Sequence, residues 1–298
     1  MNAAADKVLK DIVTDLESVL NKCGIMYHIF SRAKSEMSTK CKLEKKAETY
    51  KIEGKKMQDF LALRITLYFT DDVELVYKYL KTQPNFVDET VDKAEEDKFC
   101  PKRLNLVMRV PDTHKADMAV ARQNTGYSDL IDDTYEIQIR TILSEGWHEV
   151  EHDLRYKCKE DWTNHSEESR LLNGIYASLE SSEWSMLTLF DKLAYAQYKE
   201  RAWSAMMRNK MRLRFADKGL SQEITDYLSQ HQDLAKKLFR VKRSKILKTI
   251  MEKKFSDPLT YDTVLHLLNH IDVKDRELAD LEASILRKDM DLLFGPIE

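Results

Sequence analysis

Three segments with strong strand patterns all lie in the first half of the chain, and only helical patterns follow them. Phe60–Phe69 is dense in β-branched and aromatic residues, Leu104–Val110 is a second apolar run, and Thr134–Thr141 alternates polar with apolar side chains. Helical spacing separates these runs, and from Glu168 onward every pattern is helical. We therefore expect an α+β or α/β domain followed by an all-helical C-terminal region.

Composition narrows the class of protein. The 298 residues suffice for two domains, which we assign to 1–200 and 201–298. The net charge of −3 argues against general coating of nucleic acid, and only 7 Gly and 5 Pro favour long helices. The four cysteines are widely separated, which indicates neither a zinc site nor a disulfide framework. Because no apolar run approaches the roughly 18 residues of a membrane span, we expect a cytoplasmic protein without membrane contact.

Two of the strand patterns carry polar side chains that need an explanation. Glu136, Gln138 and Arg140 alternate with isoleucines, so all three occupy one face of their strand. A solvated outer face is the commoner cause of such alternation. Arg64 lies inside an apolar run, where an unpaired charge is costly, and either a salt bridge or a ligand phosphate would satisfy it.

Taken in order, the polar residues form a series with specific spacing. The series contains Arg32-x-Lys34-Ser35, Asp59-x-x-Ala62-x-Arg64, Glu136-Ile137-Gln138-Ile139-Arg140 and the segment Trp147–Lys157. This series closely resembles the synthetase domain of the RelA/SpoT family, the alarmone synthetases, over roughly residues 5–160. The resemblance implies a mixed β-sheet of nucleotidyltransferase type, flanked by helices. It also implies Mg²⁺-dependent transfer of pyrophosphate from ATP to a ribose 3′-hydroxyl.

The resemblance assigns the two carboxylates to the catalytic centre. Asp59 would bind Mg²⁺, and Glu136 would share the metal and orient or deprotonate the hydroxyl. Gln138, Arg140 and His152 would support the site. Two carboxylates suit Mg²⁺, a hard cation that keeps substrate phosphates among its ligands.

The same resemblance assigns the cations to ATP. Arg32 and Arg64 would flank the adenine, while the phosphates would be held by Lys34, Ser38 and Lys42. Cations of this kind offset the negative charge of phosphoryl transfer.

The acceptor half departs from the family pattern. The family motif Gly-Tyr-Arg/Lys-Ser-x-His is replaced by Cys100–Asn105, which retains the basic Lys102 but has Pro101 for the stacking Tyr and Asn105 for the His. Loss of a stacking ring removes roughly 1–3 kcal/mol per base. A guanine nucleotide is therefore expected to be a poor acceptor, and Tyr127 in the long connection Pro111–Asp133 could supply a substitute ring.

Several alternatives stay open at this point. The acceptor could be a guanosine nucleotide, an adenosine nucleotide or the 3′ end of tRNA, with basic runs at Arg208–Arg214 and Arg240–Lys245 as possible RNA contacts. Some small members of the family are toxins of toxin–antitoxin or phage-defence systems. The helical C-terminal region could bind a protein partner or a second copy of the chain. The alternative function is a catalytically silent binding or regulatory module.

Overall fold

The computed structural model describes residues 2–92, 104–253 and 255–297. It divides the chain into two compact units, the first formed by residues 1–17 and 27–183 and the second by residues 18–26 and 184–298. Within the described ranges, no helix is long and apolar enough to cross a membrane. The predicted domain boundary after residue 200 differs from the unit boundary, because the long helix α6 (Ser166–Lys199) contributes its first part to one unit and its last part to the other.

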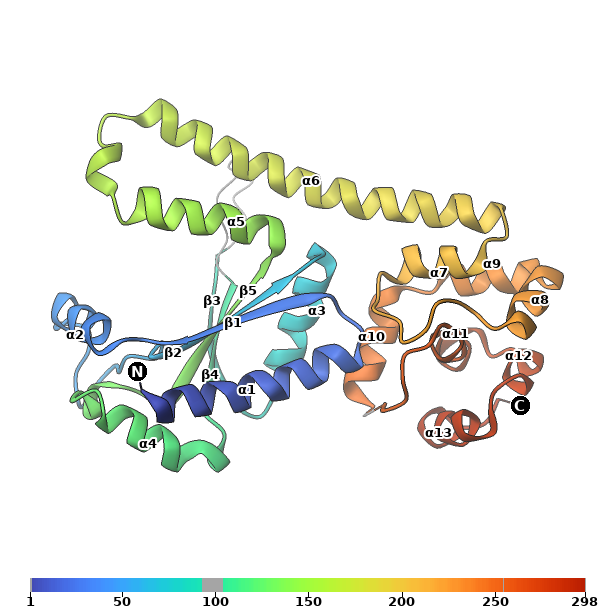
Figure 1. Ribbon diagram of the computed structural model, residues 1–298, viewed down its shortest axis with the longest axis horizontal. Coiled ribbons are helices and arrows are strands. Elements are labelled where there is room, and N and C mark those ends of the chain that lie inside the picture. Colours follow the sequence, from blue (N-terminus) through green and yellow to red (C-terminus); the bar gives the residue numbers. More distant parts are fainter. Residues whose placement is uncertain (1, 93–103, 254, 298) are drawn as a thin grey trace. The chain divides into compact units, whose positions relative to one another are not determined.

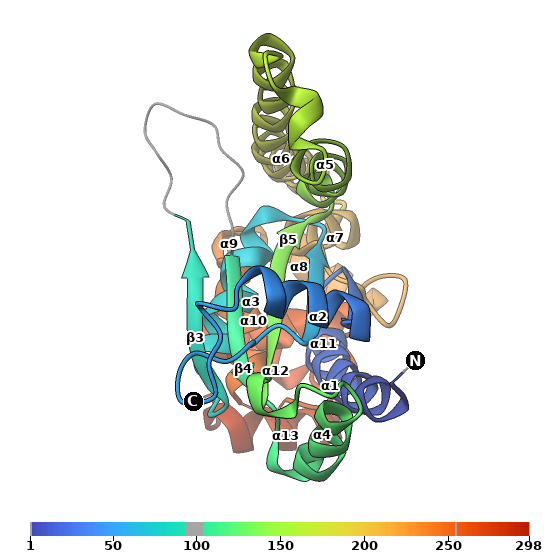
Figure 2. The same ribbon diagram turned by 90° about the vertical axis from the view of Figure 1, so that its left-hand side faces the viewer.

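A five-stranded mixed sheet forms the centre of the first unit (Figure 1). Its strands, in the spatial order β1-β2-β5-β4-β3, are β1 (Tyr27–Ala33), β2 (Leu61–Leu67), β5 (Thr134–Thr141), β4 (Leu104–Arg109) and β3 (Phe86–Val91). Strands β2 and β5 are parallel, and every other neighbouring pair is antiparallel. The expected mixed sheet with flanking helices is confirmed. Strand β3, at the edge of the sheet in Figure 2, was not predicted.

Helices flank the sheet in the first unit. They are α1 (Ala3–Lys22, whose end belongs to the second unit), α2 (Glu36–Lys45), α3 (Thr70–Lys81), α4 (Lys115–Gln123), α5 (Ile142–Glu151) and the first part of α6. Short helical turns add η1 (Asp112–His114), η2 (Ser128–Leu130), η3 (His152–Tyr156) and η4 (Lys159–Trp162). Helix α5 lies beside the start of α6, where the Trp147 indole N–H donates to the Leu172 carbonyl at 2.9 Å (Figure 1).

The long connection between β4 and β5 is folded into short helices. It contains η1, α4 and η2. Helix α4 buries Met118 and Ala121, and the Asn2 side-chain amide donates to the Ala121 carbonyl at 2.7 Å. Only these two side chains are buried along α4, so the sequence carries too little apolar periodicity to indicate a helix.

The two faces of the sheet differ in chemistry. Alternate residues such as Leu63, Ile65 and Ile137 are almost fully buried on one face. Helix α3 lies on that side, because Glu89, which pairs with the buried Leu106, accepts a hydrogen bond from Tyr77 of α3 at 2.8 Å. The residues between them on the strands point to the opposite, polar face. Because the apolar face is buried, functional side chains of the strands are expected on the polar face.

Helices joined by short connections make up the second unit, which has no strand among its described residues, and this confirms the expected helical C-terminal region. Its helices are the end of α6, α7 (Trp203–Met211), α8 (Gln222–Gln230), α9 (Gln232–Arg240), α10 (Arg243–Glu252), α11 (Tyr261–Leu268), η5 (Asn269–Val273), α12 (Arg276–Asp280) and α13 (Ser284–Phe294). Several residues of the basic runs make internal contacts: Arg243 donates to the Met211 carbonyl, Arg208 to the Tyr261 hydroxyl, and Lys210 pairs with Asp191. These contacts occupy cations that could otherwise meet RNA.

Candidate active site

The polar face carries two rows of side chains across the sheet. Because paired residues of neighbouring strands point to the same side, Glu136 shares its row with Ala62 and Arg32. Gln138 shares the next row with Arg64. The alternation that predicted one polar face on β5 is therefore confirmed, and this face meets the cations of β1 and β2.

Glu136 is held between two amides. Its Oε1 accepts hydrogen bonds from Gln138 Nε2 at 2.7 Å and from Asn105 Nδ2 at 3.3 Å. Both amide NH₂ groups donate to the same carboxylate oxygen, so these contacts fix the orientation of the Glu136 side chain. Gln138, predicted to support the site, thus contacts Glu136, and Asn105, predicted in the acceptor site, also lies beside this carboxylate.

Asp59 lies at the entrance of β2, three residues before Ala62, and forms ion pairs with two lysines. Its Oδ2 is 3.0 Å from Lys34 Nζ and 2.5 Å from Lys42 Nζ. Burial opposes ionisation of this carboxyl, but the two lysines outweigh that effect and hold its pKa below the usual range. Asp59 is therefore a fixed anion surrounded by cations.

Lys42, the partner of Asp59, belongs to helix α2. Ser35 caps α2, accepting a hydrogen bond from the Ser38 backbone N–H at 3.2 Å, and its hydroxyl meets that of Ser38 at 2.9 Å. One turn further along α2, Lys42 lies on the same side as Ser38. The Ser38 hydroxyl in the first turn and the Lys42 ammonium in the last turn are groups that suit phosphate oxygens.

The arginines of the polar face are paired with two carboxylates of α5 that the sequence did not single out. Arg64 donates to Glu145 and Glu149, and Arg140 donates to Glu145 at 3.0 Å. The two glutamates are four residues apart, so both project from one side of the helix. Arg64 also donates to Gln138 at 3.3 Å. Of the two partners that the sequence offered for Arg64, a salt bridge or a ligand phosphate, the structure shows the salt bridge.

Arg32 and Arg64 line a small groove on the polar face. It encloses about 110 Å³ and is lined by Phe30, Ser31, Arg32, Ala62, Leu63, Arg64, Gln138 and Glu149. The Phe30 side chain is 56% exposed and shares a row with Arg64. The groove thus combines an open aromatic ring with two guanidinium groups, which suits the flat face of a purine.

His148 is buried in α5 against Trp147 and Tyr176, at ring centroid distances of 5.4 and 6.0 Å. Burial and the nearby guanidinium groups of Arg140 and Arg64 lower its pKa to about 4. The imidazole is therefore neutral at neutral pH. Sequence reasoning selected His152 instead of this residue.

The other predicted residues lie away from these contacts. The ring of His152 stacks on Tyr156 at 5.7 Å, and its Nδ1 is 3.0 Å from Asp153. Tyr127 is half-buried in the segment before η2. Lys102 lies outside the described residues. The roles predicted for these three residues stay predictions.

The carboxylates satisfy the simple requirements of a Mg²⁺ site. In the part of the chain that the structure describes, no cluster of three or more His, Cys, Asp or Glu side chains could hold a metal by itself. Mg²⁺ commonly takes only one or two carboxylates and completes its shell with waters and substrate phosphates. Asp59 and Glu136 come from the same end of two parallel neighbouring strands, so the donor set fits a metal that arrives with a nucleotide.

A family model and several solved structures are similar to this chain. Small alarmone synthetase 1 from Bacillus subtilis is 22% identical, with 63% of this chain and 92% of that chain covered and a TM-score of 0.45. A GTP pyrophosphokinase family protein from Streptococcus pneumoniae is 19% identical, with coverages of 65% and 93% and a TM-score of 0.48. No curated protein matches the sequence. Residues 31–161 match the model of the region found in RelA / SpoT proteins, and this part of the chain is therefore a RelA/SpoT-family domain.

Proposed function

We propose that the domain transfers pyrophosphate from ATP to the ribose 3′-hydroxyl of an acceptor nucleotide, either a free nucleotide or the 3′ end of tRNA, with the help of Mg²⁺. The single observation that carries this proposal is the polar face. This face presents Glu136 of β5 in the row next to Arg64, and Asp59, at the entrance of β2, pairs with the cations Lys34 and Lys42. The match to the RelA/SpoT family supports the same class of reaction.

ATP binds on the β1 and β2 side of Glu136 in this proposal. The adenine enters the groove between Arg32 and Arg64, where guanidinium groups and the ring of Phe30 offer stacking surfaces. Lys34, Ser38 and Lys42 receive the phosphates. To do so the lysines exchange Asp59 for phosphate oxygens, which frees the carboxylate to bind the cation that accompanies ATP.

The transfer itself is a displacement at the β-phosphorus of ATP. The acceptor 3′-oxygen forms a bond to this phosphorus while the bond to the oxygen bridging the α- and β-phosphates breaks, and AMP leaves. Glu136, held by Gln138 and Asn105, orients the hydroxyl and receives its proton. When bound at Asp59 and Glu136, Mg²⁺ would supply positive charge that offsets the charge on the transferring group.

A labelling assay tests the proposal. The protein is incubated with γ-³²P-ATP and Mg²⁺ against GDP, GTP, AMP, ADP, ATP and bulk tRNA in separate reactions. We expect the wild type to label at least one acceptor, and Asp59→Asn and Glu136→Gln to abolish labelling while thermal unfolding stays close to that of the wild type. Glu48→Gln, an exposed carboxylate outside the site, is the matched control. Labelling at the wild-type rate in both site variants would contradict the proposal.

A further inference from the structure

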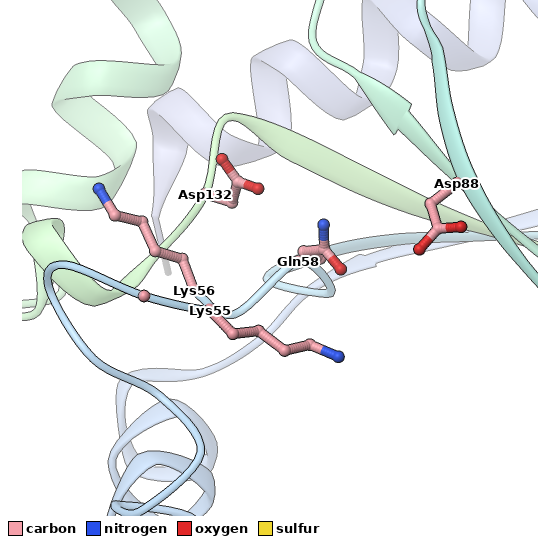
Figure 3. Close-up of a pocket in the computed structure, with 6 residues that line it drawn as sticks. Lys55, Lys56, Gln58, Asp88 and Asp132 are labelled. Atoms are coloured by element: carbon pink, nitrogen blue, oxygen red, sulfur yellow. The ribbon is translucent and has the colours of Figure 1, made fainter.

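Two groups of cations outside the candidate active site differ in their surroundings. In the first unit, a pocket is lined by Gly54, Lys55, Lys56, Gln58, Asp88 and Asp132 (Figure 3). This lining mixes both signs of charge and contains no aromatic ring. In the second unit, residues 232–245 contain six basic side chains and one acidic side chain, in a chain whose net charge is −3. The second group therefore carries a strong local excess of positive charge.

Four of the six cations in residues 232–245 are open to a ligand. Arg243 is buried, where it donates to the Met211 carbonyl, and Lys245 pairs with Asp272 at 3.0 Å. The other four are exposed and form no ion pair with any residue that the structure describes. They make up the basic patch, which consists of Lys236, Lys237, Arg240 and Lys242.

The stability of the helices does not explain the basic patch. Lys236 and Arg240 are four residues apart on α9, a spacing at which like charges repel each other across one turn. Lys242 is the N-cap of α10, and the first turn of that helix contains no acidic residue. The positive end of the helix dipole disfavours a cation at this position. The arrangement thus costs stability unless an anion neutralises it.

Aromatic rings lie next to the basic patch. Phe239 of α9 directly precedes Arg240 and contacts Tyr195 and Tyr198 of α6, at ring centroid distances of 6.2 and 5.8 Å. Tyr195 is 49% exposed, and the ammonium of Lys199 lies 4.6 Å from the centroid of its ring. The hydroxyls of Tyr195 and Tyr198 form no hydrogen bond within the described ranges. The surface therefore combines free cations with an accessible ring and free hydroxyl groups.

This combination fits a single nucleic-acid strand better than other polyanions. Lysine and arginine bind backbone phosphates, and the flat face of any base stacks on an aromatic ring. A duplex hides the faces of its bases between neighbouring pairs, and an anionic membrane offers no flat ring to stack. The free tyrosine hydroxyls can bond to a ribose 2′-hydroxyl, which RNA has and DNA lacks.

We propose that the basic patch and Tyr195 form a binding surface for single-stranded RNA in the second unit. The four cations hold the phosphates, and a base stacks on the Tyr195 ring. This surface lies outside residues 31–161, the part of the chain that matches the family model. The inference does not depend on the proposed transfer reaction, because binding to this surface requires neither ATP nor catalysis.

Fluorescence anisotropy with a labelled oligouridine of about 12 nucleotides tests the surface on the whole chain, without ATP. The wild type should bind the strand, with an affinity that falls as KCl is added. Lys236→Gln combined with Arg240→Gln should raise Kd roughly tenfold and reduce the slope of log Kd against log[KCl] by about 1.4, since each lost phosphate contact removes about 0.7. Tyr195→Ala should raise Kd roughly tenfold with an unchanged slope, because stacking releases no counterions.

Matched variants control for charge, folding and location. Lys288→Gln removes an exposed lysine from α13 of the same unit, and Lys55→Gln removes one from the pocket in Figure 3. Both should bind the oligouridine as the wild type does. Tyr195→Phe keeps the ring and should retain most of the affinity, and thermal unfolding of each variant checks its fold.

Several outcomes would overturn the proposal. Absence of binding by the wild type, or an equal loss in Lys288→Gln or Lys55→Gln, would show that the basic patch is not a binding surface for RNA. Tighter binding to an RNA duplex or to vesicles of anionic lipid would assign the surface to that other polyanion. Equal affinity for oligouridine and oligodeoxythymidine would overturn the choice of RNA over DNA.

Discussion

His148 should make the folded protein less stable in mild acid. The imidazole lies in α5 with only 9% of the residue exposed, packed against Trp147 and close to Arg140 and Arg64. Its pKa falls from the ordinary 6.5 to about 4, so the native state keeps it neutral over a range in which the unfolded chain binds a proton. Because the unfolded state then holds more protons, the free energy of unfolding decreases as the pH falls from 6.5 toward 4.

The size of the effect follows from the two pKa values. Between pH 7 and pH 5, a group with an unfolded pKa of 6.5 and a folded pKa of about 4 removes about 1.5 to 2 kcal/mol of stability. The result changes little if the folded pKa is one unit higher, because the unfolded chain takes up most of its proton in this range. The loss continues down to about pH 4 and then ends.

Urea unfolding followed by tryptophan fluorescence measures this effect at pH 7 and pH 5. His148→Gln cannot take up the proton, so we expect its loss of stability on acidification to be smaller than that of the wild type by about 1.5 to 2 kcal/mol. The absolute stability of the variant does not enter the comparison. The matched control is His152→Gln, since the His152 side chain is 46% exposed. An identical acid loss in wild type and His148→Gln would refute the reasoning.

Three further outcomes follow from individual contacts. Arg64→Ala should weaken ATP binding by roughly 1–2 kcal/mol, as measured by calorimetry. A large loss of thermal stability with unchanged affinity for ATP would instead indicate that the salt bridge from Arg64 to Glu145 is purely structural. Glu149→Gln should tighten ATP binding roughly two- to fivefold, because it removes a half-exposed carboxylate that competes with ATP for Arg64. Weaker ATP binding in this variant would show that the carboxylate assists ATP. Gly24→Ala should destabilise the protein by more than about 1 kcal/mol in thermal unfolding. Gly24 has φ +63°, and an added Cβ would lie 2.9 Å from the Arg214 carbonyl oxygen. An unchanged melting temperature would contradict that clash.

The elements that sequence predicted well are those with a strong local pattern. The strand Thr134–Thr141 has the predicted bounds, and the apolar run Phe60–Phe69 contains β2. Period-two alternation is a property of the strand alone, so it also placed Glu136 and Gln138 on one face before any partner was known. Edge strand β3 was missed because its exposed residues lack that contrast.

The tertiary structure alone decided which groups meet on that face. Asp59 and Lys42 are separated by 17 residues, Arg64 and Glu145 by 81, and no local pattern encodes such pairs. The same holds for the choice between two histidines on one helical segment. His148 and His152 are four residues apart and look equivalent in sequence, but contacts with Trp147 of the same helix and with Tyr176 of α6 bury only the first. Residue types and strand periodicity thus determined the chemistry that the chain can carry. Long-range packing determined which carboxylate, lysine and imidazole carry it, because burial and charge pairing depend on neighbours that only the folded chain brings together.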